Sequence, residues 1–174
     1  MTEQPLTISE VLRFANHDFL NHLHLIQMNL DLDRIEEAKA IIENISEHCK
    51  MLSNVNKLQL PLTVEWLQTF AWRFPAIQVV LRSHVDAAAN SELDVDIVQY
   101  LENTIIHVYD HLDPYTEQQL HMAIETNVDE LIITFHLQGK WQAPQFNKEV
   151  NHLTIQTIEE TNESWKFVLN ANKE

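Results

Sequence analysis

The stretch HDFLNHLHLIQMNLDLDRIEEAKAIIENI, residues 17–45, decides the fold of the first part of the chain. Its second half continues a run in which apolar residues alternate steps of three and four: Ile35, Ala38, Ile42, Ile45, Cys49 and Leu52. Its first half belongs to a similar run with one slip at Phe19: Ile8, Leu12, Ala15, Phe19, Leu23, Ile26 and Leu30. This spacing places each run on one stripe of a helix and predicts two helices that pack side by side.

The ends of these helices are predicted from capping signals. Thr7 and Glu10 have the spacing in which two side chains satisfy each other's orphan amide donors, so the first helix is expected to begin at Thr7 and to end near Leu30. Asp33 and Glu36 repeat that spacing and predict the start of the second helix. Because only a few residues separate the two helices, we expect an antiparallel hairpin.

Two amphipathic helices cannot enclose a core between themselves, because each apolar stripe keeps one edge in water. Pairing of two hairpins into a four-helix bundle removes this edge, so we expect a homodimer; packing of the seam on a second module is the competing explanation. Cys49 is expected to be a buried thiol without chemistry. The predicted dimer core consists of Leu12, Phe19, Leu23, Ile26, Ile35, Ile42, Ile45, Cys49 and Leu52.

The pattern changes at Pro61, which disfavours helix at the residue before it. We therefore predict a helical domain at residues 1–60 and a second module at 61–174. The second module is predicted to have helices at 63–74 and 91–112 and strands at 77–85, 119–126, 131–138, 153–159 and 165–169, with turns near Asn127, Asp129 and Asn162. The fold class is α+β, with helices on one face of a sheet.

Composition narrows the possible functions. The chain has 174 residues, 45% hydrophobic and 21% charged, which is typical of an ordered globular protein. A formal charge of −15 disfavours nucleic acid and anionic membranes as partners. No apolar run is long enough to span a bilayer and residues 1–9 do not resemble a signal peptide, so a cytoplasmic location is expected. A single glycine, Gly139, argues against a glycine-rich phosphate cradle.

The segment NHDFLN, residues 16–21, holds the candidate catalytic residues. At about 100° per residue, His17 points away from the apolar stripe, and Asn21 lies one turn further on the same face. An unprotonated imidazole is a good nucleophile toward phosphorus. The adjacent Asp18 can orient the ring, and the Asn21 amide can hydrogen-bond the incoming group.

The helix face around His17 is partly apolar, whereas a helix face that only contacts solvent is usually charged. This face is therefore predicted to be a docking surface. The candidate docking residues are Phe14, Asn16, His24, Leu25, Met28 and Leu32. The alternative is that His17 has no catalytic role and is simply one of several surface histidines, because the chain has ten histidines in all. His22, His24 and His48 lack the spacing and partner ligands of a metal site, so no metal is expected.

The stretch from His17 to Ile45 resembles the helical domain of the sporulation initiation phosphotransferase B family and of the related citrate-type sensor kinases. In that family the histidine of H-D-x-x-N, here His17, accepts a phosphoryl group from one response regulator and passes it to a second, in control of sporulation. The resemblance implies a phosphotransferase that does not use ATP, with two receiver domains as partners. Asn16 and His22 stand where relatives carry basic residues, so no local cation is expected for the phosphoryl oxygens.

The same resemblance implies that the second module looks like a degenerate histidine kinase ATPase domain. The helix expected to carry a nucleotide-binding Asn reads LENTIIHVYDHL, and only Gly139 stands where glycine-rich loops would be. We therefore expect no directly bound cofactor, with Mg²⁺ supplied by the receiver. Two alternatives stay open: an ATP-dependent sensor kinase core, and a dimeric interaction scaffold in which His17 is incidental.

Overall fold

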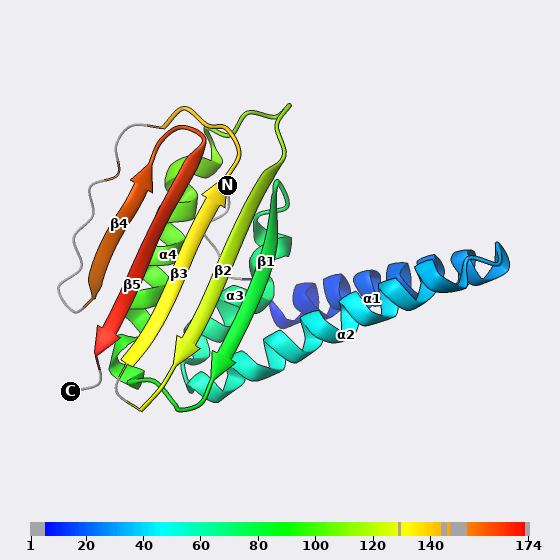
Figure 1. Cartoon of the computed structure of the whole chain (residues 1–174), viewed down its shortest axis with the longest axis horizontal. Helices are drawn as coiled ribbons and strands as arrows, with labels where there is room; N and C mark the ends of the chain where they lie inside the picture. The colour runs from blue at the N-terminus through cyan, green and yellow to red at the C-terminus, as the bar shows by residue number, and fades with distance from the viewer. Residues whose placement is uncertain (1–5, 129, 144–145, 147–152, 173–174) are drawn as a thin grey trace. The chain divides into compact units, whose positions relative to one another are not determined.

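The computed structural model describes residues 6–128, 130–143, 146 and 153–172. The chain forms two compact units, Met1–Lys50 and Met51–Glu174, and we describe each by itself. Helix α1 (Ile8–Asp31) and most of helix α2 (Ile35–Val55) form the first unit, an antiparallel hairpin (Figure 1). The predicted pair of helices is thus present.

The capping signals have different outcomes. Thr7 Oγ1 accepts a hydrogen bond from the Glu10 amide at 3.3 Å, and the Glu10 carboxylate accepts one from the Thr7 amide at 2.9 Å, so the predicted capping box is confirmed. The backbone amide of Thr7 is also the first cause that holds the pKa of Glu10 below its ordinary value. Asp33, however, does not cap α2. It has φ of 55° in the tight turn, a left-handed conformation that Asp tolerates, and the helix starts only at Ile35.

The second unit is an α+β fold, as predicted. The end of α2 and a short 3-10 helix η1 (Asn56–Leu58) lead into helix α3 (Pro61–Arg73), strand β1 (Ile77–Val85), a short 3-10 helix η2 (Ser91–Leu93) and helix α4 (Asp94–Tyr109). The remaining strands are β2 (Gln118–Thr126), β3 (Glu130–Gln138), β4 (Thr154–Glu160) and β5 (Ser164–Asn172). Asp129, placed by the sequence in the β2–β3 turn, lies outside the described residues.

The strands form one sheet in the order β1-β2-β3-β5-β4 among the described residues. β1 and β2 are parallel and the other neighbours are antiparallel. α3 and α4 cover one face of this sheet (Figure 1). Residues of β2 and β3 alternate between fully and partly buried, because successive side chains point to opposite faces. The buried set packs under the helices, where Phe135 stacks on Phe167 with ring centroids 4.6 Å apart.

A buried carboxylate joins the two helices of the second unit. Asp94, at the start of α4, accepts hydrogen bonds from the Leu62 amide, the Thr63 amide and the Thr63 hydroxyl, each at 2.8 Å. These amides lie in the first turn of α3, where backbone donors have no partner within the helix. Asp94 therefore caps α3 from a distant part of the chain.

Replacing Asp94 by Ala is expected to lower the free energy of unfolding by about 2–4 kcal/mol, because several donors at a buried helix end lose their acceptor. Urea unfolding of the full chain measures this loss. Glu92→Ala, at an exposed position of η2, is the matched control and is expected to change stability by less than about 0.5 kcal/mol. Equal effects of the two substitutions would contradict the capping role.

Candidate functional site

His17 lies on the first half of α1, and its side chain is 70% exposed. The helix is continuous from Ile8 to Asp31, so the Cα of His17 is held rigidly while its ring faces solvent. The outward direction expected from the helical repeat therefore agrees with its position in the hairpin. A bulky reactant can reach this imidazole without any rearrangement of the single chain.

One nitrogen of the His17 ring is engaged by its neighbours. Nδ1 lies 3.4 Å from Oδ1 of Asp18 and 3.2 Å from Nδ2 of Asn21. Among the described residues, Nε2 has no hydrogen-bond partner. The structure thus brings together His17, Asp18 and Asn21, the three residues that the sequence singled out, and distinguishes the two nitrogens of the ring.

The tautomer of His17 depends on which neighbour hydrogen-bonds to Nδ1. A protonated Nδ1 donates to the Asp18 carboxylate, whereas an unprotonated Nδ1 accepts from the Asn21 amide. Hydrogen bonds to a carboxylate are roughly twice as strong as neutral ones, so the Nδ1–H tautomer is favoured, and a half-turn of the Asn21 amide then offers a second acceptor. In this tautomer Nε2 carries the free electron pair.

Arg13, one helical turn before His17, is a cationic residue that the sequence analysis did not single out. It stands four residues before His17 on the same continuous helix, and this spacing puts both side chains on one face. Its guanidinium carbon lies 5.2 Å from the ring centroid of Phe14, and it forms no ion pair among the residues described here. The i, i+4 spacing makes Arg13 a candidate cation for a group bound at His17, whereas the expectation that no local cation is available stays a prediction.

The candidate docking residues differ in exposure. Phe14 is half-buried, whereas Asn16, His24, Leu25, Met28 and Leu32 are exposed. Leu25 and Met28 present large apolar side chains to solvent within three turns of His17. An exposed apolar strip beside a reactive imidazole is typical of a surface that another protein covers.

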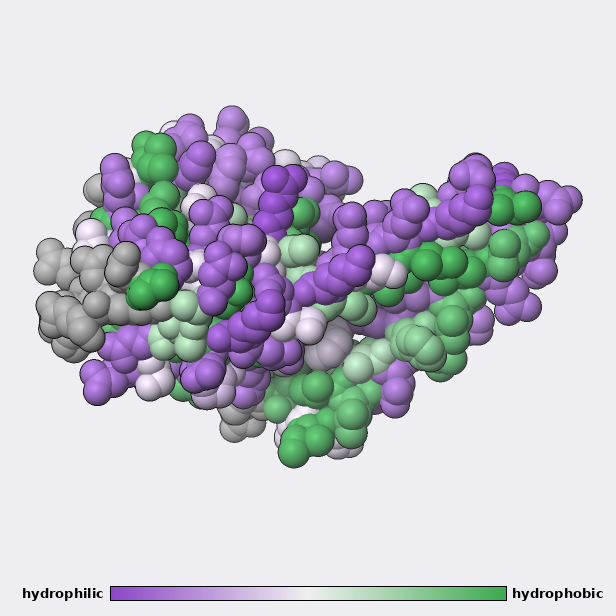
Figure 2. Space-filling view, turned by 60° about the horizontal axis from the view of Figure 1, so that its bottom comes forward, coloured by the Kyte–Doolittle hydropathy of each residue, from purple (hydrophilic) through white to green (hydrophobic). Residues whose placement is uncertain are grey.

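The predicted dimer seam is largely exposed in the single chain. Phe19 is 62% exposed and Ile42 48%, whereas Ile26, Ile45 and Leu52 are partly buried. Figure 2 shows apolar surface running along the helices. Leu12, Leu23, Ile35 and Cys49 are exposed as well, so the single chain does not bury Cys49 and its burial in a dimer core stays a prediction. The hairpin itself buries Ala38 and Asn29.

His22 and His48 approach each other across the hairpin. Partial burial, and then the positive charge of His22, hold the pKa of His48 below its ordinary value. Within the described part of the chain, no three His, Cys, Asp or Glu side chains are grouped in a way that holds a metal ion. Within the same residues, no helix is both long and apolar enough to cross a membrane.

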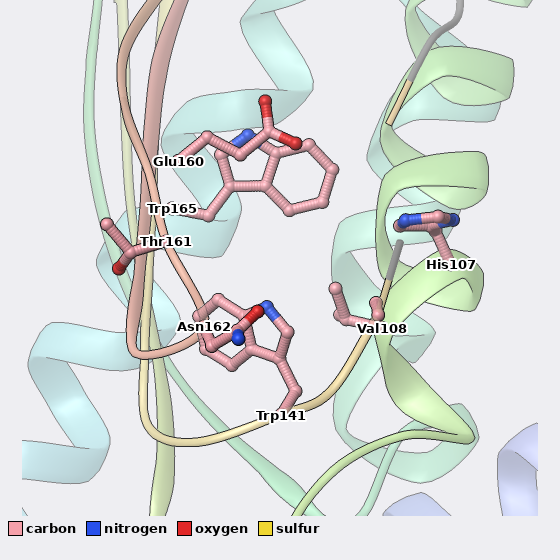
Figure 3. A pocket seen from close by; sticks show the side chains of 8 residues that line it. His107, Val108, Trp141, Glu160, Thr161, Asn162 and Trp165 are labelled. Atoms are coloured by element: carbon pink, nitrogen blue, oxygen red, sulfur yellow. The ribbon is translucent and has the colours of Figure 1, made fainter. Parts of the chain in front are cut away.

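The second unit contains a cavity of about 300 Å³ between the end of α4, the segment that follows β3 and the β4–β5 turn (Figure 3). His107 and Val108 border it from α4, and Trp141, Trp165 and Glu160 border it from the sheet side. The Glu160 charge adds to burial in raising the pKa of Tyr100 to about 12. A carboxylate at the wall of this cavity repels phosphates.

Asn103 and Gly139 stand where the sequence analysis looked for a nucleotide-binding Asn and a glycine-rich loop. The Asn103 amide, on the helix expected to carry a nucleotide-binding Asn, donates to the Gln99 carbonyl at 2.5 Å. Gly139 has φ of 153°, and a Cβ on it would lie 1.8 Å from Oε1 of the buried Gln118. The lone glycine is therefore required by close packing on Gln118.

This chain is similar to known proteins through one family model and through several solved structures. Residues 1–58 match the model of the alpha-helical domain of SpoOB-type sensor kinases. A comparison with curated proteins found no match. Three similar solved structures have identities of 11–13% and TM-scores of 0.39–0.42. At these values the solved structures carry no conclusion about activity, whereas the family match covers the helices that hold His17.

The first of these structures is the Acinetobacter baumannii histidine kinase AdeS, 11% identical with a TM-score of 0.40, which covers 90% of this chain and 97% of that chain. The second is a histidine kinase from Burkholderia phymatum STM815, 13% identical with a TM-score of 0.42, which covers 93% and 90%. The third is the histidine kinase ThkA in complex with the response regulator protein TrrA, 11% identical with a TM-score of 0.39, which covers 95% and 61%.

Proposed function

We propose that this chain, whose helical hairpin belongs to the SpoOB-type sensor kinase alpha-helical domain family, is a histidine phosphotransferase of a phosphorelay. His17 accepts a phosphoryl group from the aspartyl phosphate of one response regulator and passes it to an aspartate of a second. The observation that carries this proposal is the exposed imidazole whose Nδ1 is engaged by Asp18 and Asn21, which leaves Nε2 as the reactive nitrogen.

The transfer conserves protons at the histidine. The electron pair of Nε2 attacks phosphorus, the bond between phosphorus and the aspartyl oxygen breaks, and the aspartate leaves as a carboxylate. The proton on Nδ1 stays hydrogen-bonded to Asp18. In the second step a carboxylate oxygen of the other receiver attacks phosphorus, and the electron pair of the broken N–P bond returns to Nε2. A helix that already holds the ring lowers the entropic cost of both steps.

Arg13 is proposed to stabilise the phosphoryl oxygens, whose charge is also neutralised by the Mg²⁺ that the receiver carries. Arg13→Gln is therefore expected to slow transfer by about ten- to a hundredfold, because one charge-assisted contact to the transferred group is lost. The rate of label transfer between two purified receivers measures this. Lys39→Gln, on the exposed surface of α2, is the matched control. A transfer rate that stays unchanged in Arg13→Gln would remove Arg13 from the mechanism.

Dimerisation is part of the proposal, because the exposed apolar seam needs a partner and a second hairpin offers the same stripe. Each pair of hairpins then carries two His17 rings on its outside. The exposed residues beside His17, including Leu25 and Met28, form the proposed receiver contact. The cytoplasmic location and the control of sporulation rest on sequence and on the family resemblance alone.

The proposed independence from ATP is supported by the second unit. Asn103 is hydrogen-bonded to its own helix, Gly139 is required by Gln118, and the cavity at the end of α4 is bordered by the carboxylate of Glu160. None of these arrangements offers a cation or a backbone cradle to a triphosphate. No directly bound cofactor is therefore proposed.

The test is to mix the full chain with a phosphorylated receiver and Mg²⁺ and to follow the label. The expected result is acid-labile, base-stable phosphate on His17, followed by its movement to a second receiver. Incubation with labelled ATP and no partner is the parallel arm. Incorporation from ATP would replace the proposal by a sensor kinase core, and no label from any receiver tested would favour the interaction scaffold.

A further inference from the structure

The face of the sheet that α3 and α4 do not cover contains a hollow of about 380 Å³. Its lining includes Arg82 from β1, His121 from β2, Thr134, His136 and Gln138 from β3, and Lys166 from β5. We call this hollow the basic groove. It lies entirely within the second unit and does not include His17 or the cavity of Figure 3.

The strand register places the basic side chains next to one another. His121 is directly opposite His136, and His136 is directly opposite Lys166, so the three form one row across β2, β3 and β5. Arg82 is opposite Ala123, which is opposite Thr134, so the guanidinium stands in the adjacent row. Side chains that are directly opposite in a sheet have Cβ atoms about 5 Å apart. The basic side chains of four neighbouring strands therefore line the same groove, with Arg82 toward the β1 side and Lys166 toward the β5 side.

This concentration of positive charge is unusual in a chain of net charge −15 that has only 11 Lys and Arg residues. Like charges placed opposite each other destabilise a sheet unless something compensates them. Among the described residues, neither Arg82 nor Lys166 forms an ion pair. Burial, and then the charges of Lys166 and His121, lower the pKa of His136, whereas Glu159, which is directly opposite Lys166 on β4, raises it.

We propose that the basic groove binds the phosphate group of a small anionic molecule. Arg82 supplies a fork of donors that matches phosphate oxygens, and Lys166 supplies a point charge. The hydroxyl of Thr134 and the amide of Gln138 add neutral donors at the same place. The Nε2 atoms of His121 and His136 lie 2.8 Å from Gln119 Oε1 and 3.3 Å from Ser164 Oγ. Because the Gln119 oxygen accepts a hydrogen bond from Nε2 of His121, Nδ1 of that ring can donate to an anion only when the ring is protonated.

Proton uptake is coupled to anion binding in this arrangement. His136 gains a second donor when it is protonated, and a bound dianion offsets the repulsion from Lys166 and His121. Binding therefore raises the pKa of His136, and the affinity for the anion rises as pH falls. Sulfate is the cleanest probe of this coupling, because it stays a dianion while His136 gains its proton.

The test is an NMR titration of the full chain with inorganic phosphate, sulfate and malonate at constant ionic strength. Phosphate and sulfate are expected to give saturable amide shifts confined to the groove strands, with sulfate affinity rising between about pH 8 and about pH 5.5. Lys166→Gln and Arg82→Gln are each expected to weaken binding at least about tenfold. Lys140→Gln, outside the groove, is the matched control and should bind as the parent chain does.

Several results would overturn the proposal. Amide shifts that fail to saturate with phosphate would show that the groove does not bind it specifically. Amide shifts that are the same in Lys166→Gln, Arg82→Gln and the parent chain would show that these two side chains do not form the site. If malonate binds as tightly as phosphate, the proposed ligand would be a dicarboxylate and not a phosphate compound. Because the readout does not involve phosphoryl transfer, failure here leaves the assignment of His17 untouched, and loss of transfer in His17→Gln leaves the basic groove untouched.

Discussion

Replacing His17 by Gln is expected to reduce phosphoryl transfer between two receivers by at least about a thousandfold, to the limit of detection. Gln keeps a polar side chain of similar length but has no ring nitrogen with a free electron pair. Because His17 is exposed and contributes no contact to the core, the helix content and the dimer dissociation constant of the variant should equal those of the parent chain. The loss therefore reports chemistry and not folding.

The matched control for this substitution is His22→Gln on the same helix. His22 is also exposed, but the helical repeat turns it toward α2, where it faces His48. Transfer by His22→Gln is expected to stay within about twofold of the parent rate. Persistence of transfer in His17→Gln would identify the chain as a scaffold. The attachment site is checked separately by NMR of the phosphorylated ring, where phosphorus is expected on Nε2.

Replacing Ile42 by Asp is expected to break the dimer. Ile42 is 48% exposed in the single chain, so the hairpin tolerates a carboxylate there, whereas the proposed four-helix core does not. An unpaired buried carboxylate costs about 3 kcal/mol or more, and twofold symmetry places it in the core twice. The dimer dissociation constant should therefore rise by roughly ten-thousandfold, which sedimentation equilibrium measures.

Ile45 and Met28 make this experiment specific. Ile45 is partly buried within the hairpin, so Ile45→Asp should dissociate the dimer and also lower the helix content. Met28 is exposed on the side of α1 that carries His17, so Met28→Asp should leave the dimer intact and slow transfer by weakening receiver docking. A dimer that survives Ile42→Asp would mean that the seam does not lie between two chains.

Where sequence and structure agree, the interactions are local. The α1 capping box joins residues three positions apart, and the outward direction of His17 follows from the angle between successive residues of a helix. The predicted strands of the second unit agree with those of the structure for the same reason. Alternation of side chains with a period of two is a property of each strand alone. The capping prediction at Asp33 was wrong because the sharp turn needs a residue with positive φ at that position.

The sequence by itself determined the helical hairpin, the α+β class of the second unit and the outward position of His17, because these depend on the spacing of side chains along one element. Only the tertiary structure decided which helix end Asp94 caps, why Gly139 is required, and that His121, His136 and Lys166 form one row. These arrangements join residues far apart in the chain. Strand register and helix packing set them, and the repeat of a single helix or strand carries no information about its neighbour.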